Sequence, residues 1–95
     1  MNNYLQQEAE CIKQALSAGT SVPENSDSLF IMYAVLMRAK GVDVTASDVH
    51  DAWSAWMMQQ DPEHEAIRPY EELDQETKDL DEPFLLAIKK ALSSS

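Results

Sequence analysis

The spacing of hydrophobic residues along the chain predicts a protein built from helices. In the first segment, residues 1–18, apolar residues recur every three or four positions, the period of an amphipathic helix: Leu5, Ala9, Ile12 and Leu16. The next segment, residues 27–41, is apolar on nearly all sides, and Asp27 or Ser28 can cap its start. Such a helix is either buried in a core or contacts another copy. We expect a central second helix, and a homo-oligomer that uses it or the first helix.

The pattern over residues 45–93 predicts a longer helical region, with one helix at its start and another at its end. The sequence "TASD" (45–48) has the form of a capping box, in which Thr45 and Asp48 bond each other's backbone amides. One face of the helix that follows is apolar: Val49, Ala52, Trp53, Trp56 and Met57. Asp81 suits the cap of a last helix, whose apolar stripe is Phe84, Leu85, Ile88 and Leu92. The pattern predicts an all-α fold, a small single-domain bundle of three to four main helices.

The acidic stretch "PYEELDQETKDLDEP" (69–83) raises a question, because its seven carboxylates could form a metal loop, a solvated surface or a connector. A calcium loop needs a glycine at its sharp turn and a distal bidentate carboxylate, and this stretch has neither. The sequence therefore predicts a Pro-Tyr turn followed by a short helical connector. Tyr70 and Leu73 should point inward, Leu73 should join Trp53 in the core, and most carboxylates should face solvent.

Composition and charge narrow the possible functions. No apolar run approaches the roughly 20 residues of a membrane span, and the N-terminus lacks a signal peptide. Cys11 is the single cysteine, which indicates a reducing cytoplasm. The net charge is −10, and residues 41–95 carry −9 of it, so direct binding to nucleic acid is excluded. The stretch "HEAIR" (64–68) lacks the second histidine of a zinc motif, and the sequence shows no activated nucleophile. We therefore expect a protein that binds no metal or cofactor and is not an enzyme.

The two tryptophans are the most informative candidates for a binding site. Trp53 and Trp56 lie three positions apart on one helix, and residues in that pattern are usually buried. A chain of 95 residues cannot easily bury both indoles completely, and a partly exposed indole offers a flat surface to a ring or a cation. His50 lies one turn before Trp53 on the same helix.

The motif "VHDAWSAW" (49–56), a following histidine and the stretch "IRPYEELDQETKDLD" (67–81) resemble the ryanodine-receptor repeat, or RyR domain. The matching positions are Val49, His50, Trp53, His64, Pro69, Tyr70, Leu73, Lys78 and Asp81. The compact form of the motif is similar to members from bacteria and their phages. The resemblance covers about half of the chain.

This resemblance implies a non-enzymatic binding module for a nucleotide-derived messenger, which a phage could use to sequester a signal of host defence. Trp53 or Trp56 and Tyr70 would stack on the base. Arg68, together with His50 and His64, would contact the phosphate. The alternative belongs to a different functional class: a small acidic interaction module that binds and inhibits a basic host protein. Salt distinguishes the two, because binding through exposed charge weakens with ionic strength.

Overall fold

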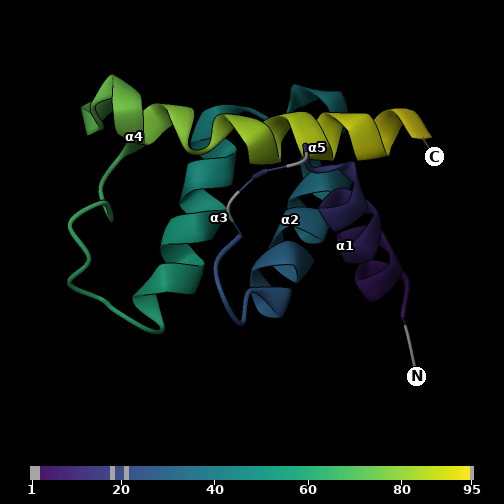
Figure 1. Ribbon diagram of the computed structural model, residues 1–95, viewed down its shortest axis with the longest axis horizontal. Coiled ribbons are helices and arrows are strands. Elements are labelled where there is room, and N and C mark those ends of the chain that lie inside the picture. Colours follow the sequence, from purple (N-terminus) through teal and green to yellow (C-terminus); the bar gives the residue numbers. More distant parts are fainter. Residues whose placement is uncertain (1–2, 18, 21, 95) are drawn as a thin grey trace.

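The described part of the chain folds into four main α-helices joined by turns and three short helical segments (Figure 1). The computed structural model describes residues 3–17, 19–20 and 22–94. The main helices are α1 (Tyr4–Ala15), α2 (Asp27–Lys40), α3 (Ala46–Met58) and α5 (Glu82–Ser94). The short segments are η1 (Gly41–Asp43), η2 (Tyr70–Glu72) and α4 (Gln75–Asp79). No strand occurs in these described ranges, so the predicted all-α fold is confirmed.

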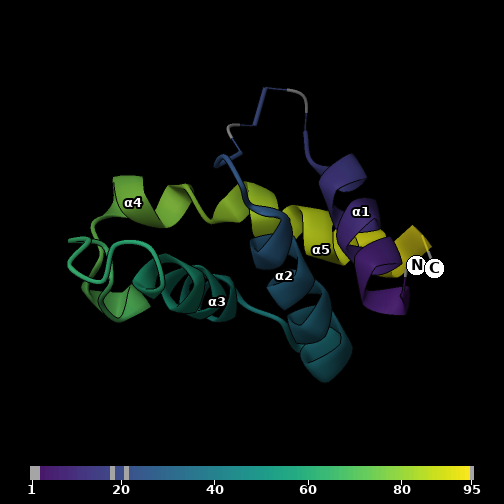
Figure 2. The same cartoon turned by 90° about the horizontal axis from the view of Figure 1, so that it is seen from below.

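Helix α5 crosses one end of the other three main helices (Figure 1). Seen from below, α1, α2 and α3 follow one another along α5, with α2 between the other two (Figure 2). Contacts join α2 to both of its neighbours and α5 to all three. Helix α2 thus contacts the other three main helices and η1, which agrees with its apolar residues on nearly all sides.

The core forms where α2 meets α5. Phe30, Tyr33 and Phe84 pack their rings against one another, with centroids 5.6 to 6.1 Å apart. Five α2 residues are buried: Leu29, Phe30, Tyr33, Ala34 and Met37. One chain therefore covers most of the apolar surface of α2, although Val35 stays 49% exposed. The predicted homo-oligomer is not needed to bury this helix, and it stays a prediction.

The ends of the helices follow local rules, with one exception. Thr45 accepts a hydrogen bond from the Asp48 amide, and Asp48 accepts one from the Thr45 amide, so the predicted capping box is confirmed. Gly41 ends α2 with a φ of 57°, a conformation that other residues rarely adopt. The predicted cap of α2 was wrong, because Ser26 occupies that position. Asp27 instead lies in the first turn and pairs with Lys13 at 2.6 Å.

The segment between α3 and α5 is the predicted turn and connector. Pro69 precedes η2, Leu73 is buried, and Asp74 accepts a hydrogen bond from the Thr77 amide to cap α4. Nine acidic residues between positions 59 and 82 are exposed: Asp61, Glu63, Glu65, Glu71, Glu72, Asp74, Glu76, Asp79 and Glu82. None of the helices in the described part of the chain is long and apolar enough to cross a membrane.

Candidate functional site

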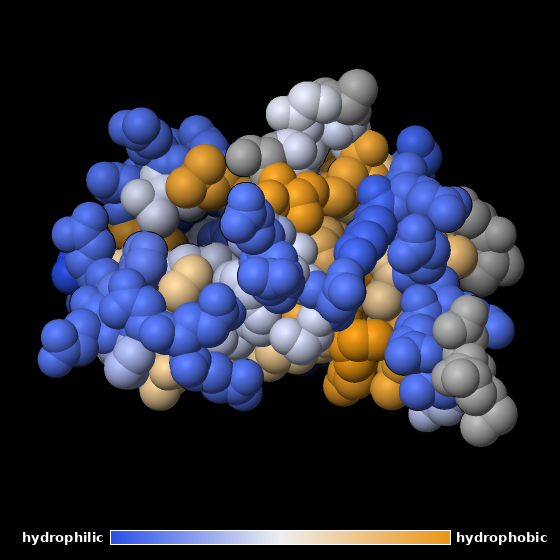
Figure 3. Space-filling view, turned by 60° about the horizontal axis from the view of Figure 1, so that its bottom comes forward, coloured by the Kyte–Doolittle hydropathy of each residue, from blue (hydrophilic) through white to orange (hydrophobic). Residues whose placement is uncertain are grey.

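A cavity of about 260 Å³ opens between α2, α3, α5 and the loop that follows α3. Figure 3 shows the surface hollowed on the side of the molecule that carries mostly hydrophilic residues. The residues around the cavity come from distant parts of the sequence: Pro23, Leu29, Tyr33, His50, Trp53, His64, Ala66, Thr77, Leu80, Asp81 and Phe84. Most of these side chains are apolar or aromatic, so the few polar ones define its chemistry.

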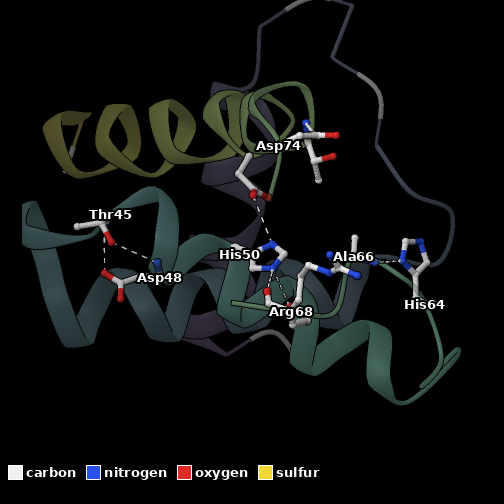
Figure 4. A network of polar contacts seen from close by, with 10 residues as sticks. Thr45, Asp48, His50, His64, Ala66, Arg68 and Asp74 are labelled. Atoms are coloured by element: carbon white, nitrogen blue, oxygen red, sulfur yellow. Dashed lines mark hydrogen bonds and ion pairs between the residues drawn. The ribbon is translucent and has the colours of Figure 1, made fainter. Parts of the chain in front are cut away.

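A buried histidine and a buried aspartate lie side by side in the cavity wall. His50 is 2% exposed and Asp81 is 8% exposed. His50 Nε2 lies 2.7 Å from the backbone oxygen of Arg68, and His50 Nδ1 lies 3.5 Å from Asp81 Oδ2. Figure 4 shows the imidazole of His50 against the Arg68 backbone. His50 thereby connects α3 both to the loop and to the start of α5.

The hydrogen bonds of His50 restrict where its protons lie. A backbone carbonyl only accepts, so Nε2 carries a proton and donates it to Arg68. In a neutral His50 ring, Nδ1 is then unprotonated. A hydrogen bond between Nδ1 and the Asp81 carboxylate therefore needs one more proton, which either of the two groups can carry. The pair is therefore neutral with that proton and carries one negative charge without it.

Burial also changes the acidity of the groups beside this pair. Removal from water raises the pKa of Asp81 to about 6, although the nearby His50 opposes the shift. Burial, together with the negative charge of Asp81, raises the pKa of the Tyr33 hydroxyl well above its usual range. The charge of Asp81 therefore changes at a pH well above that of an ordinary aspartate.

The aromatic part of the wall consists of three rings in contact, one pair stacked and the other pair edge to face. The Trp53 indole lies between the imidazoles of His50 and His64, with centroids 5.6 and 5.2 Å away. The interplanar angles are 23° for His50 and 84° for His64. His64 Nδ1 accepts a hydrogen bond from the Ala66 amide at 3.1 Å, which helps to fix the orientation of the ring (Figure 4). Packing thus holds Trp53 in the wall with part of its surface open.

Ser54, His50 and Asp81 follow the order of a hydrolytic triad, but the geometry does not allow that chemistry. Ser54 Oγ lies 3.3 Å from His50 Nε2, and Asp81 lies on the Nδ1 side. A base must have a free lone pair on Nε2, whereas this nitrogen donates its proton to the Arg68 carbonyl at 2.7 Å. Ser54 also lines a different hollow, on the Tyr70 side of α3. We interpret the three residues as a structural connection.

A wider groove between α1 and α2 is a weaker candidate. Its volume is about 550 Å³, twice that of the cavity. Its polar lining residues, such as Gln7, Glu10 and Asp27, are mostly exposed and none is buried. In addition, no group of three or more metal-binding side chains occurs in the described residues. The cavity at His50 and Asp81 is therefore the site with buried polar groups.

Comparison with family models identifies the chain. A family described as "Domain of unknown function (DUF7701)" matches residues 3–93. The chain belongs to the DUF7701 family. The expected membership of the ryanodine-receptor repeat family was wrong, because the DUF7701 match covers nearly the whole chain and nothing indicates the other family. Searches of curated proteins and of solved structures gave no significant match.

The DUF7701 fold brings together three of the six predicted site residues. His50, Trp53 and His64 line the cavity. Tyr70 packs on the other side of His50, with ring centroids 6.2 Å apart, and lines the hollow that also holds Ser54. Arg68 contributes its carbonyl to His50, while its exposed guanidinium bonds the Glu65 carbonyl at 3.1 Å.

The structure buries Trp56 and leaves Trp53 partly exposed. Trp56 is buried at 3% exposure, and its Nε1 donates a hydrogen bond to Ser28 Oγ at 3.0 Å. Trp53, which was expected in the core, is partly buried and packs against its edge. Periodicity places both indoles on one apolar face, but only the neighbouring helices decide which of them is covered.

Sequence reasoning missed the most important polar group of the site. Asp81 precedes α5 as expected of a cap, but its side chain contacts His50, 31 positions earlier in the chain. Tyr33 and Phe84 were expected only as apolar helix residues, and they also line the cavity. A charged residue directly before an apolar stripe was the one available signal, and it fits a helix cap equally well.

Proposed function

We propose that this DUF7701 protein is a non-enzymatic domain that binds a small molecule in the cavity between α2, α3 and α5. The observation that supports it most is the wall itself, where buried His50, Asp81 and Tyr33 adjoin the partly open Trp53. Ligand sites typically combine an apolar, aromatic lining with a few well-placed polar groups. The volume of about 260 Å³ lies just below the roughly 300–1,000 Å³ of drug-sized sites, so the ligand is small.

The proposal does not retain a nucleotide phosphate as the bound group. That expectation depended on the ryanodine-receptor resemblance, which the DUF7701 match replaces. It also depended on Arg68, whose guanidinium lies outside the cavity lining. The lining includes neither lysine nor arginine among the described residues, and phosphate sites usually contain one or both.

The alternative of an acidic module that binds a basic protein is favoured by charge alone. Between positions 59 and 82 there are ten acidic residues and two basic ones. Charge does not locate a docking surface, however, since a solvated acidic surface also keeps a protein soluble. The expectations of a basic host partner, a phage origin, a cytoplasmic setting and a homo-oligomer stay predictions.

The two tryptophans offer a direct test of the cavity. Replacing Trp56→Phe leaves Trp53 as the single indole, so fluorescence then reports from the cavity wall. We expect members of a library of small polar and aromatic fragments to shift the Trp53 emission and to raise the melting temperature. A ligand at 100 times its Kd stabilises the folded state by about 2.7 kcal/mol.

The matched control is Trp53→Phe, which keeps Trp56 in its buried position against Ser28. Its emission should not respond to the same fragments, because Trp56 does not line the cavity. If no fragment shifts either the emission or the melting temperature of the Trp56→Phe protein, the cavity is not a binding site.

A further inference from the structure

The lining of the cavity includes one carboxylate, that of Asp81. The described lining residues contain no lysine or arginine to neutralise it. His50 and His64 carry a charge only when protonated, and the faces of Tyr33, Trp53 and Phe84 are electron-rich. Anionic ligands would thus meet a carboxylate and the negative faces of rings. A cation would meet both as attractive partners.

Asp81 also has unused capacity to accept hydrogen bonds. An ionised carboxylate has about four acceptor sites. Among the described residues, the structure shows one polar contact of this side chain, with His50 at 3.5 Å. This distance is longer than the roughly 2.7–2.9 Å of a charge-assisted hydrogen bond. The buried carboxylate is therefore only weakly compensated by the protein itself.

We propose that the ligand of this cavity is a small organic cation, in which an ammonium group contacts Asp81 and its apolar substituents contact the surrounding rings. This inference rests on the proposed small-molecule site and names the chemistry of its ligand. The cavity volume of about 260 Å³ equals roughly nine water molecules at about 30 Å³ each, which suits a branched or single-ring ammonium compound.

The charge of the whole protein supports the same ligand. Nine exposed acidic residues lie between positions 59 and 82, the segment that also provides His64, Ala66, Thr77 and Leu80 to the cavity. A surface of one sign raises the local concentration of opposite charges and speeds their arrival. The acidity that makes phosphate an unfavourable ligand thus favours a cation.

Binding should depend on the ionisation of Asp81. The titratable groups that interact with it are His50 from α3, Tyr33 from α2 and Tyr70 from η2. His64 also lines the cavity. The proton that neutralises the His50–Asp81 pair competes with a ligand cation for the same place. We therefore expect affinity to fall about tenfold when the pH is lowered by one unit below the pKa of the pair.

A matched pair of probes tests the inference on the full chain. Protonated 3,3-dimethylbutan-1-amine and 3,3-dimethylbutan-1-ol have the same shape, but only the amine is charged and can donate N–H hydrogen bonds to Asp81. In titrations followed by Trp53 emission of the Trp56→Phe protein and by calorimetry of the parent, we expect the amine to bind at least ten times more tightly. Asp81→Asn should remove this preference. Glu76→Gln, which changes the same charge at an exposed position on α4, should keep it.

The outcomes separate this inference from the proposed function. Equal binding of the two probes would contradict the cation and leave the small-molecule site in place. If neither probe binds while neutral fragments still shift Trp53 emission, the cation is again wrong and the site stands. If neither the probes nor any fragment binds, both proposals fail. Should Asp81→Asn not fold, the comparison of the two probes on the parent decides alone.

Discussion

At the scale of single residues, His50 has the most connections in the site. Its Nε2 is bonded to the Arg68 carbonyl, its Nδ1 faces Asp81, and its ring stacks on Trp53. A buried histidine of this kind is usually structural, and here it joins α3 to two segments that lie far away in sequence. The same connections place a titratable pair in the wall of the cavity, where burial makes its charge costly.

The pair predicts how stability depends on pH. Asp81 has a pKa of about 6 in the folded protein, above the roughly 3.9 of an unfolded aspartate. The folded state then holds the proton more tightly, so this contribution to stability is complete below about pH 4 and is lost as the pH rises to about 6. Asp81→Asn is neutral at every pH. As the pH rises from about 4 to about 7, we expect the melting temperature of Asp81→Asn to increase relative to that of the parent protein.

Melting curves of both proteins over this pH range provide the measurement. Other carboxylates are common to the two proteins and cancel in the difference. Glu76→Gln serves as the control, since its side chain is exposed and its difference from the parent should stay nearly constant. A constant difference for Asp81→Asn as well would mean that Asp81 takes up no proton in this range.

At the scale of elements, short-range hydrogen bonds set where the helices begin. The capping boxes of α1 and α3, and the cap of α4 by Asp74, each use a side chain three positions from the amide that it bonds. Such pairs can be found in a sequence because they depend on local spacing alone. In α2 the expectation failed by one residue, since Asp27 pairs with Lys13 of α1 and Ser28 accepts from Trp56.

The capping box of α3 has a measurable effect on stability. Thr45→Ala removes the side chain that accepts from the Asp48 amide at 3.2 Å. We expect the free energy of unfolding in urea to fall by about 1 kcal/mol. Ser47→Ala, two positions later within α3, should be neutral or slightly stabilising, because alanine is the better helix former. Equal losses in the two variants would show that the cap contributes nothing specific.

At the scale of the whole molecule, charge is the dominant feature. The protein carries a net charge of −10 and measures 34 × 27 × 25 Å. At about 10 mM salt the Debye length is about 30 Å, so nearly all carboxylates repel one another across the fold. The exposed ion pairs Lys13–Asp27, Arg38–Glu8 and Lys40–Asp48 offset little of this repulsion, since such pairs contribute about 0–1 kcal/mol each.

Salt should therefore stabilise the protein. We expect the melting temperature to rise between about 10 mM and about 300 mM sodium chloride, because the Debye length falls below 10 Å and repulsion is screened. Potassium chloride should have the same effect, which distinguishes screening from binding of one particular cation. A melting temperature that falls with salt would show that the ion pairs outweigh the net repulsion.

The sequence by itself determined the helices, the capping box of α3, the turn at Pro69 and the acidic connector. These features depend on the period of apolar residues and on contacts within a few positions, which the order of residues contains directly. The tertiary structure alone decided that Trp56 rather than Trp53 is buried, and that Arg68 contributes its carbonyl rather than its guanidinium. It also decided that Asp81 contacts His50. Contacts of this kind join residues 18 to 31 positions apart or depend on which helix face is covered, so they exist only once the helices have packed around one another.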